Sequence, residues 1–424
     1  MEDLKTCMVD DLKRISPAGA QTYSKSSRYF SSPVILDHGK GSHVWDENGK
    51  EYIDFIAALG PVTIGYADDR VNAAIKKQLE KGISFSTPTR IEYELCKKLT
   101  QIIPGCEQVR LLKNGRDATD AAVRLARAYT GRDIILKAGY HGMSDWTVAT
   151  EPNCGGIPQE IKDLSVKFKY NDFDDFTEKI RHIGDIACVI LEPIMENGTK
   201  PGYLEQVKEL CQKYGIVLIY DEVVSGAHIA LGGAAEYYGV TPDLTCIGKG
   251  YANGMPISAV CGRKEIMSLI ETGEAFISTT FGGETLSIAA ALKTIKILEQ
   301  PGTYEHIWRL GEKLIRCTKN MINDFGLKDV LQVSGLPPHC GLAFNGIGSL
   351  DYLDIWSIYA QETQNVGILS LDMNFIMLSH TEKDIDMLLD ATLVAMIKIK
   401  KAIEQDSIEG ILIGSKLNPI FKRR

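Results

Sequence analysis

The chain has 424 residues, of which 44% are hydrophobic and 24% are charged, a composition that excludes collagen-like, disordered and coiled-coil proteins. Its 47 Lys and Arg against 55 Asp and Glu residues give a net charge of −8, which argues against nucleic acid as a partner, because such binding normally needs a basic face. The first residues lack an apolar leader, no stretch reaches the roughly 18 apolar residues of a membrane span, and the ten cysteines form no Cys-x-x-Cys pair. We therefore expect a cytoplasmic protein with scattered free thiols that does not bind a membrane.

The chain begins with a pattern of extended segments and then changes to alternating helices and strands. Apolar runs at 34–36, 43–46 and 52–55 enclose an Asn48-Gly49 turn, which predicts a hairpin. From about Asp69, helical periodicity alternates with apolar runs at 109–112, 133–136, 186–191, 216–220, 244–247 and 258–261. Apolar strands separated by helices predict a mostly parallel sheet covered on both faces, in an α/β fold.

The last third of the chain has a different pattern. Beyond about Pro301, long amphipathic helices with two or three weak strands predict a smaller α+β unit, to which the N-terminal hairpin attaches. The tail from about Asp406 is expected to be a solvated end.

Polar residues follow several of the predicted strands, at the sheet edge where ligands of open α/β folds bind. After the run at 109–112, a turn containing Gly115 leads into a helix, whose free N–H groups suit a phosphate. An ordinary helix cap by Asn114 or Asp117 explains the same residues.

Three further side chains are predicted at this edge. Asp221 ends a buried strand and needs a cationic partner. Lys249 lies in a glycine-rich turn, where burial would lower its pKa and make its amine nucleophilic, although a solvated loop lysine is the alternative. Tyr140 adds an aromatic face. Together these features suit a ligand with a phosphate, a cationic ring nitrogen, a flat ring and an aldehyde, and pyridoxal phosphate has all four.

The stretch from about Ser24 to about Asp386 resembles the class III pyridoxal-phosphate aminotransferases, most closely the branch containing glutamate-1-semialdehyde aminomutase. The resemblance is carried by GSHVWD at 41–46 with NGKEYIDF at 48–55, by RLARAYTGR at 124–132, and by GVTPDL at 239–244, which leads into Lys249. It implies a fold type I transferase, with a large domain built on a mostly parallel seven-stranded sheet and a smaller α+β domain. The expected parts are an N-terminal segment at 1–60 that packs with the small domain, a large cofactor domain at 61–305, and the small domain at 306–424.

The resemblance also implies roles for individual residues. Lys249 would form the internal aldimine with pyridoxal 5'-phosphate and later move the substrate's proton. Asp221 would keep the pyridine nitrogen protonated, while Tyr140 would stack on one face of the ring and Val223 would pack on the other. The other expected cofactor contacts are Asn114, Gly115, Arg116, Glu192, Asn197 and Thr280.

Some of these contacts carry an alternative. Thr280 resembles a threonine that reaches the phosphate from the neighbouring subunit, so a homodimer with shared sites is implied, and Thr279 is the alternative if the alignment slips by one residue. Glu192 and Asn197 resemble residues near the 3′-hydroxyl side of the cofactor, but a strand-end carboxylate that caps a loop also explains Glu192.

The chain departs from the aminomutase pattern at three places. Arg116 replaces a small hydroxyl residue and could bind the cofactor phosphate or hold an anion of the substrate. Asp372 aligns with the gating glutamate of the aminomutase, and Gly226-Ala227-His228 replaces a usual Gly-Phe-Arg. Arg28 is retained and resembles an arginine that binds a substrate carboxylate, with an ordinary surface arginine as the alternative.

These departures favour an aminotransferase that moves an amino group between an amino-acid donor and an aldehyde or ketone. The extra arginine, Arg116, indicates an acceptor that is anionic or phosphorylated. A glutamate-1-semialdehyde-type 2,1-aminomutase is the alternative, and a decarboxylase or racemase could use the same Lys249 and Asp221. A nicotinamide-dependent dehydrogenase is disfavoured because no G-x-G-x-x-G follows the first strand of a βαβ unit.

Overall fold

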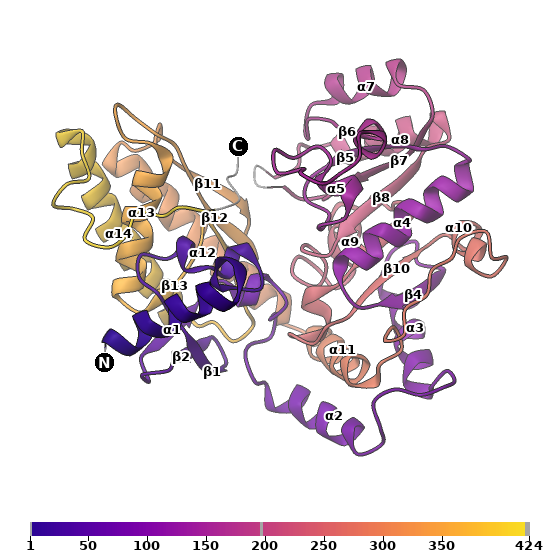
Figure 1. Cartoon of the computed structure of the whole chain (residues 1–424), viewed down its shortest axis with the longest axis horizontal. Coiled ribbons are helices and arrows are strands. Elements are labelled where there is room, and N and C mark those ends of the chain that lie inside the picture. Colours follow the sequence, from indigo (N-terminus) through magenta and orange to yellow (C-terminus); the bar gives the residue numbers. More distant parts are fainter. Residues whose placement is uncertain (1, 196–197, 420–424) are drawn as a thin grey trace. The chain divides into compact units, whose positions relative to one another are not determined.

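The computed structural model describes residues 2–195 and 198–419 (Figure 1). The chain divides into two compact units, one formed by Asp69–Tyr304 and the other by Met1–Asp68 together with Glu305–Arg424. We call these the large unit and the small unit. The small unit thus takes residues from both ends of the chain, whereas the large unit is one continuous segment.

A seven-stranded sheet forms the centre of the large unit, with the strand order β4-β10-β9-β8-β7-β5-β6. The strands are β4 (Gln108–Leu112), β5 (Ile134–Ala138), β6 (Ser165–Lys167), β7 (Ile186–Leu191), β8 (Val217–Glu222), β9 (Leu244–Ile247) and β10 (Ser258–Gly262). All neighbours are parallel except β10, which is antiparallel to both β4 and β9. The predicted mostly parallel sheet is confirmed, and the strand that no apolar run indicated is β6, which has only three residues.

Helices cover both faces of this sheet. Alternate residues of β7 point to opposite faces of the sheet. Cys188 and Ile190 pack into a cluster with α4 (Gly115–Thr130), whereas Val189 and Leu191 pack into a second cluster with α7 (Phe173–His182) and α8 (Tyr203–Tyr214). Every residue of β7, β8, β9 and β10 is buried, and each large apolar side chain so buried contributes about 1.5–3 kcal/mol. The helices of the large unit are α2 (Asp69–Leu79), α3 (Arg90–Ile102), α4 (Gly115–Thr130), α5 (Asp145–Val148), α6 (Gln159–Asp163), α7 (Phe173–His182), α8 (Tyr203–Tyr214), α9 (Gly233–Tyr238), α10 (Lys264–Met267) and α11 (Thr285–Leu298).

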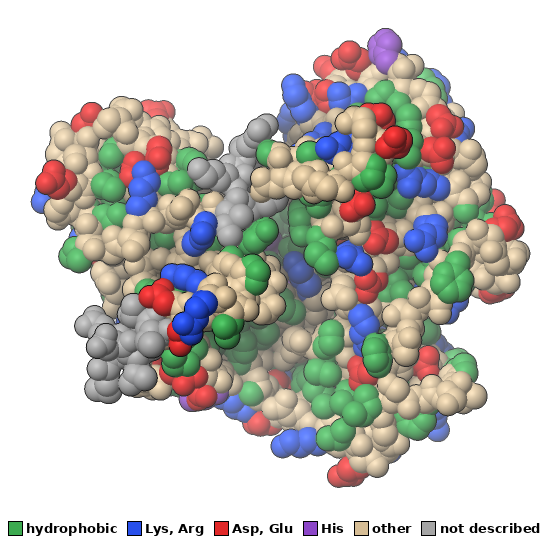
Figure 2. Space-filling model, viewed as in Figure 1, with side chains coloured by type: hydrophobic (Ala, Val, Ile, Leu, Met, Phe, Trp, Pro, Cys, Tyr) green, Lys and Arg blue, Asp and Glu red, His purple; other side chains and the backbone are tan. Residues whose placement is uncertain are grey.

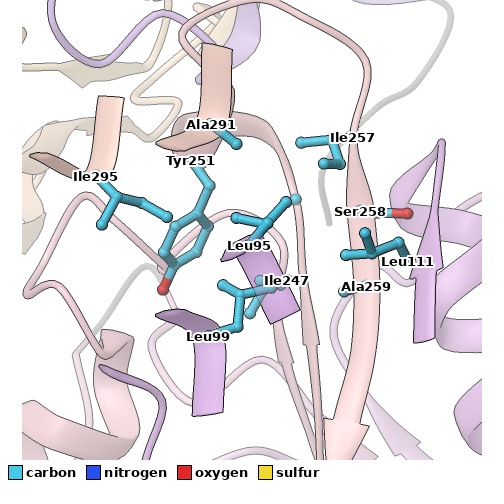
Figure 3. A pocket seen from close by; sticks show the side chains of 11 residues that line it. Leu95, Leu99, Leu111, Ile247, Tyr251, Ile257, Ser258, Ala259, Ala291 and Ile295 are labelled. Carbon is cyan, nitrogen blue, oxygen red and sulfur yellow. The ribbon is translucent and has the colours of Figure 1, made fainter. Parts of the chain in front are cut away.

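A small apolar cavity lies where α3 and α11 meet the sheet (Figure 3). Its lining side chains are aliphatic apart from the Tyr251 ring and Ser258. Both hydroxyls are engaged: Tyr251 donates to the carbonyl of Leu231 at 2.8 Å, and Ser258 donates to the carbonyl of Asn114 at 2.7 Å. This cavity is therefore part of the core, and its contribution to a site is the support that Ser258 gives to the start of α4.

The small unit contains two sheets. One has the order β1-β2-β3-β13 and the other β11-β12-β14, and β13 pairs in parallel with β3, which joins a C-terminal segment to the N-terminal hairpin. The strands are β1 (Leu36–Lys40), β2 (His43–Asp46), β3 (Glu51–Asp54), β11 (Leu331–Leu336), β12 (His339–Phe344), β13 (Ile368–Leu369) and β14 (Met373–Phe375). The helices are α1 (Glu2–Ile15), α12 (Thr303–Phe325), α13 (Tyr352–Asn365) and α14 (Glu382–Gln405).

The C-terminal tail differs from the sequence prediction. Ile411 and Leu417 are only 5% and 2% exposed, so the prediction of a solvated end is wrong for this stretch. The physical reason is α13, which is buried along most of its length and carries polar side chains that need partners. Gln361 accepts from the backbone N–H of Ile413 at 2.7 Å, and Ser357 accepts from that of Leu417 at 2.9 Å.

Among the described residues, no helix combines the length and the apolar character needed to cross a membrane.

Candidate active site

The carboxyl ends of five strands meet at one edge of the large sheet. The register pairs Ala138 with Leu191, Leu191 with Tyr220, and Glu222 with Ile247. Strand β4 points the same way as β9, because both are antiparallel to β10. The segments that follow these strands therefore start side by side, which is where the sequence predicted a ligand.

Lys249 follows β9 between two glycines and is partly buried. Its φ of +43° lies in the left-handed region, which costs a residue with a side chain roughly 1–2 kcal/mol. Burial lowers the pKa of Lys249, and the carboxylates of Glu192 and Asp221 oppose this shift. Because burial is the largest of these influences, the amine is more readily neutral, and hence nucleophilic, than an ordinary lysine.

Asp221 lies in β8 and is 4% exposed. Its Oδ2 is 2.8 Å from Nδ1 of His141, and its Oδ1 accepts from the backbone N–H of Val223 at 3.1 Å. The sequence predicted that Asp221 needs a partner but did not single out His141, which is itself 2% exposed. The only signal was its position directly after Tyr140, in the turn that follows β5.

Glu192 and Tyr140 are joined across the same edge. The backbone N–H of Tyr140 donates to Oε1 of Glu192 at 2.8 Å, and a Cβ at Gly139, where φ is +106°, would lie 3.0 Å from Cγ of Glu192. Glu192 thus caps the turn after β5, as its structural alternative predicted. Burial and the nearby Asp221 raise the pKa of Glu192, against the influence of His141 and Lys249. The ring of Tyr140 is 60% exposed and offers a flat surface at this edge.

The first turn of α4 lies against Val223. A Cβ at Gly115 would be 2.6 Å from Cγ1 of Val223, so this close approach requires glycine. Asp117 accepts from the backbone N–H of Asn114 at 2.8 Å, which is the helix cap that the sequence offered as an alternative. The first N–H groups of any helix lack partners within the helix, so the cap and an anion site are compatible here.

Arg116 is exposed in this turn and is not held closely by its acidic neighbours. Its Nε is 3.9 Å from carboxylate oxygens of both Asp117 and Asp120. Asp120 is engaged elsewhere, because it accepts from Ser144 Oγ at 2.6 Å and from Trp146 Nε1 at 2.7 Å. The guanidinium is thus placed for an anion near the start of α4.

Apart from Asn197, the other predicted residues belong to the loop before α11 or to the small unit. Thr279 and Thr280 are exposed in the loop that precedes α11. Asn197 lies outside the described residues. Arg28 is exposed in a turn of the small unit, at Ser27–Tyr29, and Asp372 also belongs to the small unit. Their predicted roles stay predictions.

Comparison with known proteins decides the family. The family model described as Aminotransferase class-III matches residues 23–334. The chain belongs to the class III aminotransferases. The predicted family and cofactor are thereby confirmed: the protein is a transaminase dependent on pyridoxal 5'-phosphate.

Relatives of this class III aminotransferase cover nearly all of its length. A glutamate-1-semialdehyde 2,1-aminomutase of Syntrophobacter fumaroxidans is 33% identical over 436 residues, which cover 94% of this chain and 98% of the relative. A 3-aminobutyryl-CoA aminotransferase of Cloacimonas acidaminovorans is 35% identical over 408 residues, which cover 93% of this chain and 97% of the relative. The names of these two relatives support both interpretations, aminotransferase and aminomutase.

Solved structures show the same fold. An omega-transaminase from Sphaerobacter thermophilus has a TM-score of 0.84 and 27% identity, with 93% of this chain and 97% of that chain covered. A transaminase with pyridoxal phosphate bound has a TM-score of 0.87 and 26% identity, with 95% and 99% covered. The predicted fold type I architecture is confirmed.

The residues at the sheet edge fit the cofactor. The edge holds a lysine whose pKa is lowered, a buried carboxylate that accepts from a histidine and a backbone N–H, an exposed aromatic ring, and a helix N-terminus beside an arginine. These are the partners that the aldehyde, the ring nitrogen, the ring face and the phosphate of pyridoxal phosphate require.

Proposed function

We propose that Lys249 and Asp221 form the centre of the transamination site, with the cofactor lying between them and the first turn of α4. The observation that carries this proposal is the place of Lys249, just after the end of β9 at the sheet edge, where burial lowers the pKa of its amine and the carboxylates of Glu192 and Asp221 oppose that shift. When bound, pyridoxal phosphate supplies an electron sink and the carbonyl that accepts an amino group.

The residues of the protein would bind the cofactor and move the proton. Lys249 Nζ acts as a general base that removes the proton from the substrate carbon bearing the amino group, and its lowered pKa favours this role. Asp221 holds a proton on the ring nitrogen. Tyr140 and Val223 pack on the two ring faces, and the N–H groups of Gly115 and Arg116 bind the phosphate.

A second copy of the chain would complete the site through Thr280. Phe276 and Phe281, on either side of Thr280, are 77% and 58% exposed, and Phe85 is 52% exposed. The segment before Phe85 lies against this loop, because the backbone N–H of Thr285 donates to the carbonyl of Ile83 at 2.9 Å. Hydrophobic side chains are also visible at the surface around α2 (Figure 2). An exposed apolar surface of this kind is typical of an interface, which supports a homodimer.

The acceptor is proposed to carry an anion bound by Arg116. In support, the guanidinium lies at a helix N-terminus and its Nε is no nearer than 3.9 Å to the Asp117 and Asp120 carboxylates. One relative, the 3-aminobutyryl-CoA aminotransferase, is named for a coenzyme A derivative. The second candidate, a 2,1-aminomutase, is favoured by the similarity to the relative of that name.

The chain is proposed to work in the cytoplasm. Its nine described cysteines are free, and six of them are buried. Free thiols throughout a chain are usual in a reducing compartment.

The proposed substrates are tested with the purified holoenzyme and a panel of amino donors. For a transaminase we expect net formation of a keto acid from the amino donor. An aminomutase would instead isomerise a single substrate and form no keto acid from a donor. In Arg116→Thr, we expect the KM for a phosphorylated acceptor to rise about tenfold, with the affinity for the cofactor nearly unchanged. An unchanged KM together with a weakened affinity for the cofactor would show that Arg116 serves the cofactor instead.

A further inference from the structure

We infer that Lys113 and Glu284 are a positioning pair: their ion pair holds the turn that carries Thr280, so that this turn can reach the cofactor phosphate of a second copy of the chain. This inference rests on the proposed homodimer and on the proposed role of Thr280. Neither Lys113 nor Glu284 is proposed to touch the cofactor, and both act through Thr280.

A charged pair joins the end of β4 to the start of α11. Lys113 Nζ lies 2.9 Å from Glu284 Oε2, and the two side chains are only 13% and 12% exposed. The same carboxylate accepts from the backbone N–H of Leu286 and from Ser287 Oγ, each at 2.6 Å, and so caps α11. Burial alone would raise the pKa of Glu284, but hydrogen bonds from Ser287 and Lys113 outweigh it, so the pKa is lowered and the carboxylate is charged. Charges shielded from solvent are screened less by salt, so this link is stronger than a surface ion pair.

Thr280 lies in a closed turn directly before this pair. The backbone N–H of Gly282 donates to the carbonyl of Thr279 at 3.2 Å, so Thr280 and Phe281 are the central residues of a β-turn. The backbone N–H of Glu284 donates to the carbonyl of Phe281 at 3.1 Å. The path of the chain from the ion pair to Thr280 is therefore short and hydrogen-bonded, and a shift of Glu284 would move Thr280.

The turn also lies against the strand that Lys113 follows. A Cβ at Gly282 would be 2.7 Å from the carbonyl oxygen of Leu111, so glycine is needed where the turn meets β4. Lys113 comes directly after this strand and reaches Glu284 just beyond the turn. The turn is therefore held by a close backbone contact and by the ion pair, and loss of the ammonium group would release one of these two restraints.

A second bond of Lys113 leads toward the proposed cofactor site of its own subunit. Its Nζ donates to the carbonyl of Pro256 at 3.1 Å, in the segment between Lys249 and β10. Ser258, two residues later, donates from Oγ to the carbonyl of Asn114 at 2.7 Å, at the start of α4. This bond to Asn114 does not involve Lys113, so the start of α4 stays anchored without the lysine. We therefore assign the main effect of Lys113 to the turn of Glu284, and hence to the site of the second copy.

Mixed dimers separate the two sites. Two versions of the chain with different affinity tags are co-expressed and purified in sequence, and one of them carries Lys249→Ala, so that only the other chain can join the cofactor to lysine. Lys113→Met is placed either in the chain with the intact Lys249, which gives the same-chain dimer, or in the chain with Lys249→Ala, which gives the opposite-chain dimer. The visible absorbance of the lysine-bound cofactor then gives the dissociation constant of this single site.

The opposite-chain dimer should be the weaker one. Its single working site takes Lys249 from the unaltered chain and Thr280 from the chain with Lys113→Met. We expect its dissociation constant for pyridoxal phosphate to rise about fivefold, as for part of one hydrogen bond to a charged group. The constant for pyridoxal, which lacks the phosphate, should stay the same. The same-chain dimer should bind both compounds as tightly as the mixed dimer without Lys113→Met.

Three further variants serve as controls. Lys98→Met removes an ion pair of the same 2.9 Å length, to Glu299 at the other end of α11, and should change neither constant in either dimer. Thr280→Ala in the opposite chain tests the proposed function itself and should raise the constant for pyridoxal phosphate about tenfold. Glu284→Gln neutralises the other member of the pair and should reproduce the effect of Lys113→Met, which provides the test if Lys113→Met does not fold.

The outcomes distinguish this inference from the proposed function. If Thr280→Ala in the opposite chain has no effect, or if no mixed dimer forms, the proposed function of Thr280 fails and the inference falls with it. If Thr280→Ala weakens binding but Lys113→Met has no effect, acts only in the same-chain dimer or acts equally in both dimers, the inference alone is overturned. Equal weakening of pyridoxal and pyridoxal phosphate would also overturn it, because that result would mean a general structural role.

Discussion

The large unit buries charged groups in two kinds of surroundings, and Asp221 and its neighbour Glu222 at the end of β8 illustrate both. Glu222 accepts from Ser225 Oγ at 2.5 Å and from the backbone N–H groups of Ala234 and Ala235, each at 2.9 Å. Each oxygen thus has a donor from the first turn of α9, and Ser225 adds a third. Asp221 has two donors, one on each oxygen, and its charge opposes the lowering of the Lys249 pKa. Glu222 is thus the structural carboxylate, which ties α9 to the end of β8, and Asp221 is the one at the sheet edge whose charge acts on Lys249.

Two lysines of the large unit with lowered pKa, Lys137 and Lys249, differ in their surroundings. Lys137 in β5 is 1% exposed, donates to the carbonyl of Thr147 at 2.5 Å, and lies 3.5 Å from Glu151. Lys249 instead follows β9 at the sheet edge with a backbone φ of +43°, and Glu192 and Asp221 both influence its pKa. Burial lowers the pKa of both amines, so a lowered pKa alone does not identify the functional lysine. The surroundings of the amine identify it.

The largest effect should come from the functional carboxylate. In Asp221→Ala we expect kcat for amino transfer to fall about 10²–10³-fold, because the charge that stabilises the protonated ring nitrogen is gone. Steady-state kinetics at saturating cofactor checks this value, with circular dichroism to verify the fold. A kcat within tenfold of the unchanged enzyme would remove Asp221 from the site.

The structural carboxylate should behave in the opposite way. Glu222→Gln replaces one acceptor by a donor that faces other donors, so we expect the free energy of unfolding to fall by about 1–3 kcal/mol. Activity at low temperature should stay near that of the unchanged enzyme. Urea unfolding measures this change. The control is Glu299→Gln, which disturbs an exposed ion pair with Lys98 and should lower the free energy of unfolding by less than about 1 kcal/mol. Equal losses in the two variants would refute the contrast between Asp221 and Glu222.

A smaller effect concerns the pH dependence of stability. Burial lowers the pKa of Lys137 from its ordinary value of 10.5 to about 8. Between these values the unfolded chain binds more protons than the folded one, so Lys137 makes stability rise with pH, by at most about 1.4 kcal/mol per pH unit. Lys137→Met should reduce this slope, measured by urea unfolding of the apoprotein between about pH 8 and 9.5. Lys98→Met is the control, and a slope unchanged in Lys137→Met would contradict the assignment.

Apolar runs in the sequence were sufficient to place six of the seven strands and the two residues Asp221 and Lys249, which lie in or just after such runs. Asp221 and Lys249 could be placed by such runs alone. His141 could not, because it comes from the turn after β5, and β7 lies between β5 and β8 in the sheet. Its approach to Asp221 depends on a turn that contains Gly139 and Gly142, both with positive φ. No local pattern specifies how far such a turn reaches.

Other differences arise from partners distant in the sequence. The tail around Leu417 looked solvated because it has no regular pattern, yet it packs against α13 and satisfies its buried Ser357. The three residues of β6 are too few to form an apolar run. The predicted role of Thr280 depends on a second copy of the chain, so no single chain can test it.

The central claim is that Lys249, and not the buried Lys137, carries the cofactor. Reduction of the purified holoenzyme with borohydride makes the bond between cofactor and lysine permanent, and peptide mass spectrometry then locates it. We predict the added mass on the peptide that contains Lys249, none on the peptide that contains Lys137, and no labelled peptide in Lys249→Ala. Label on Lys137 or another lysine, or no label in a protein that carries out amino transfer, would contradict the account.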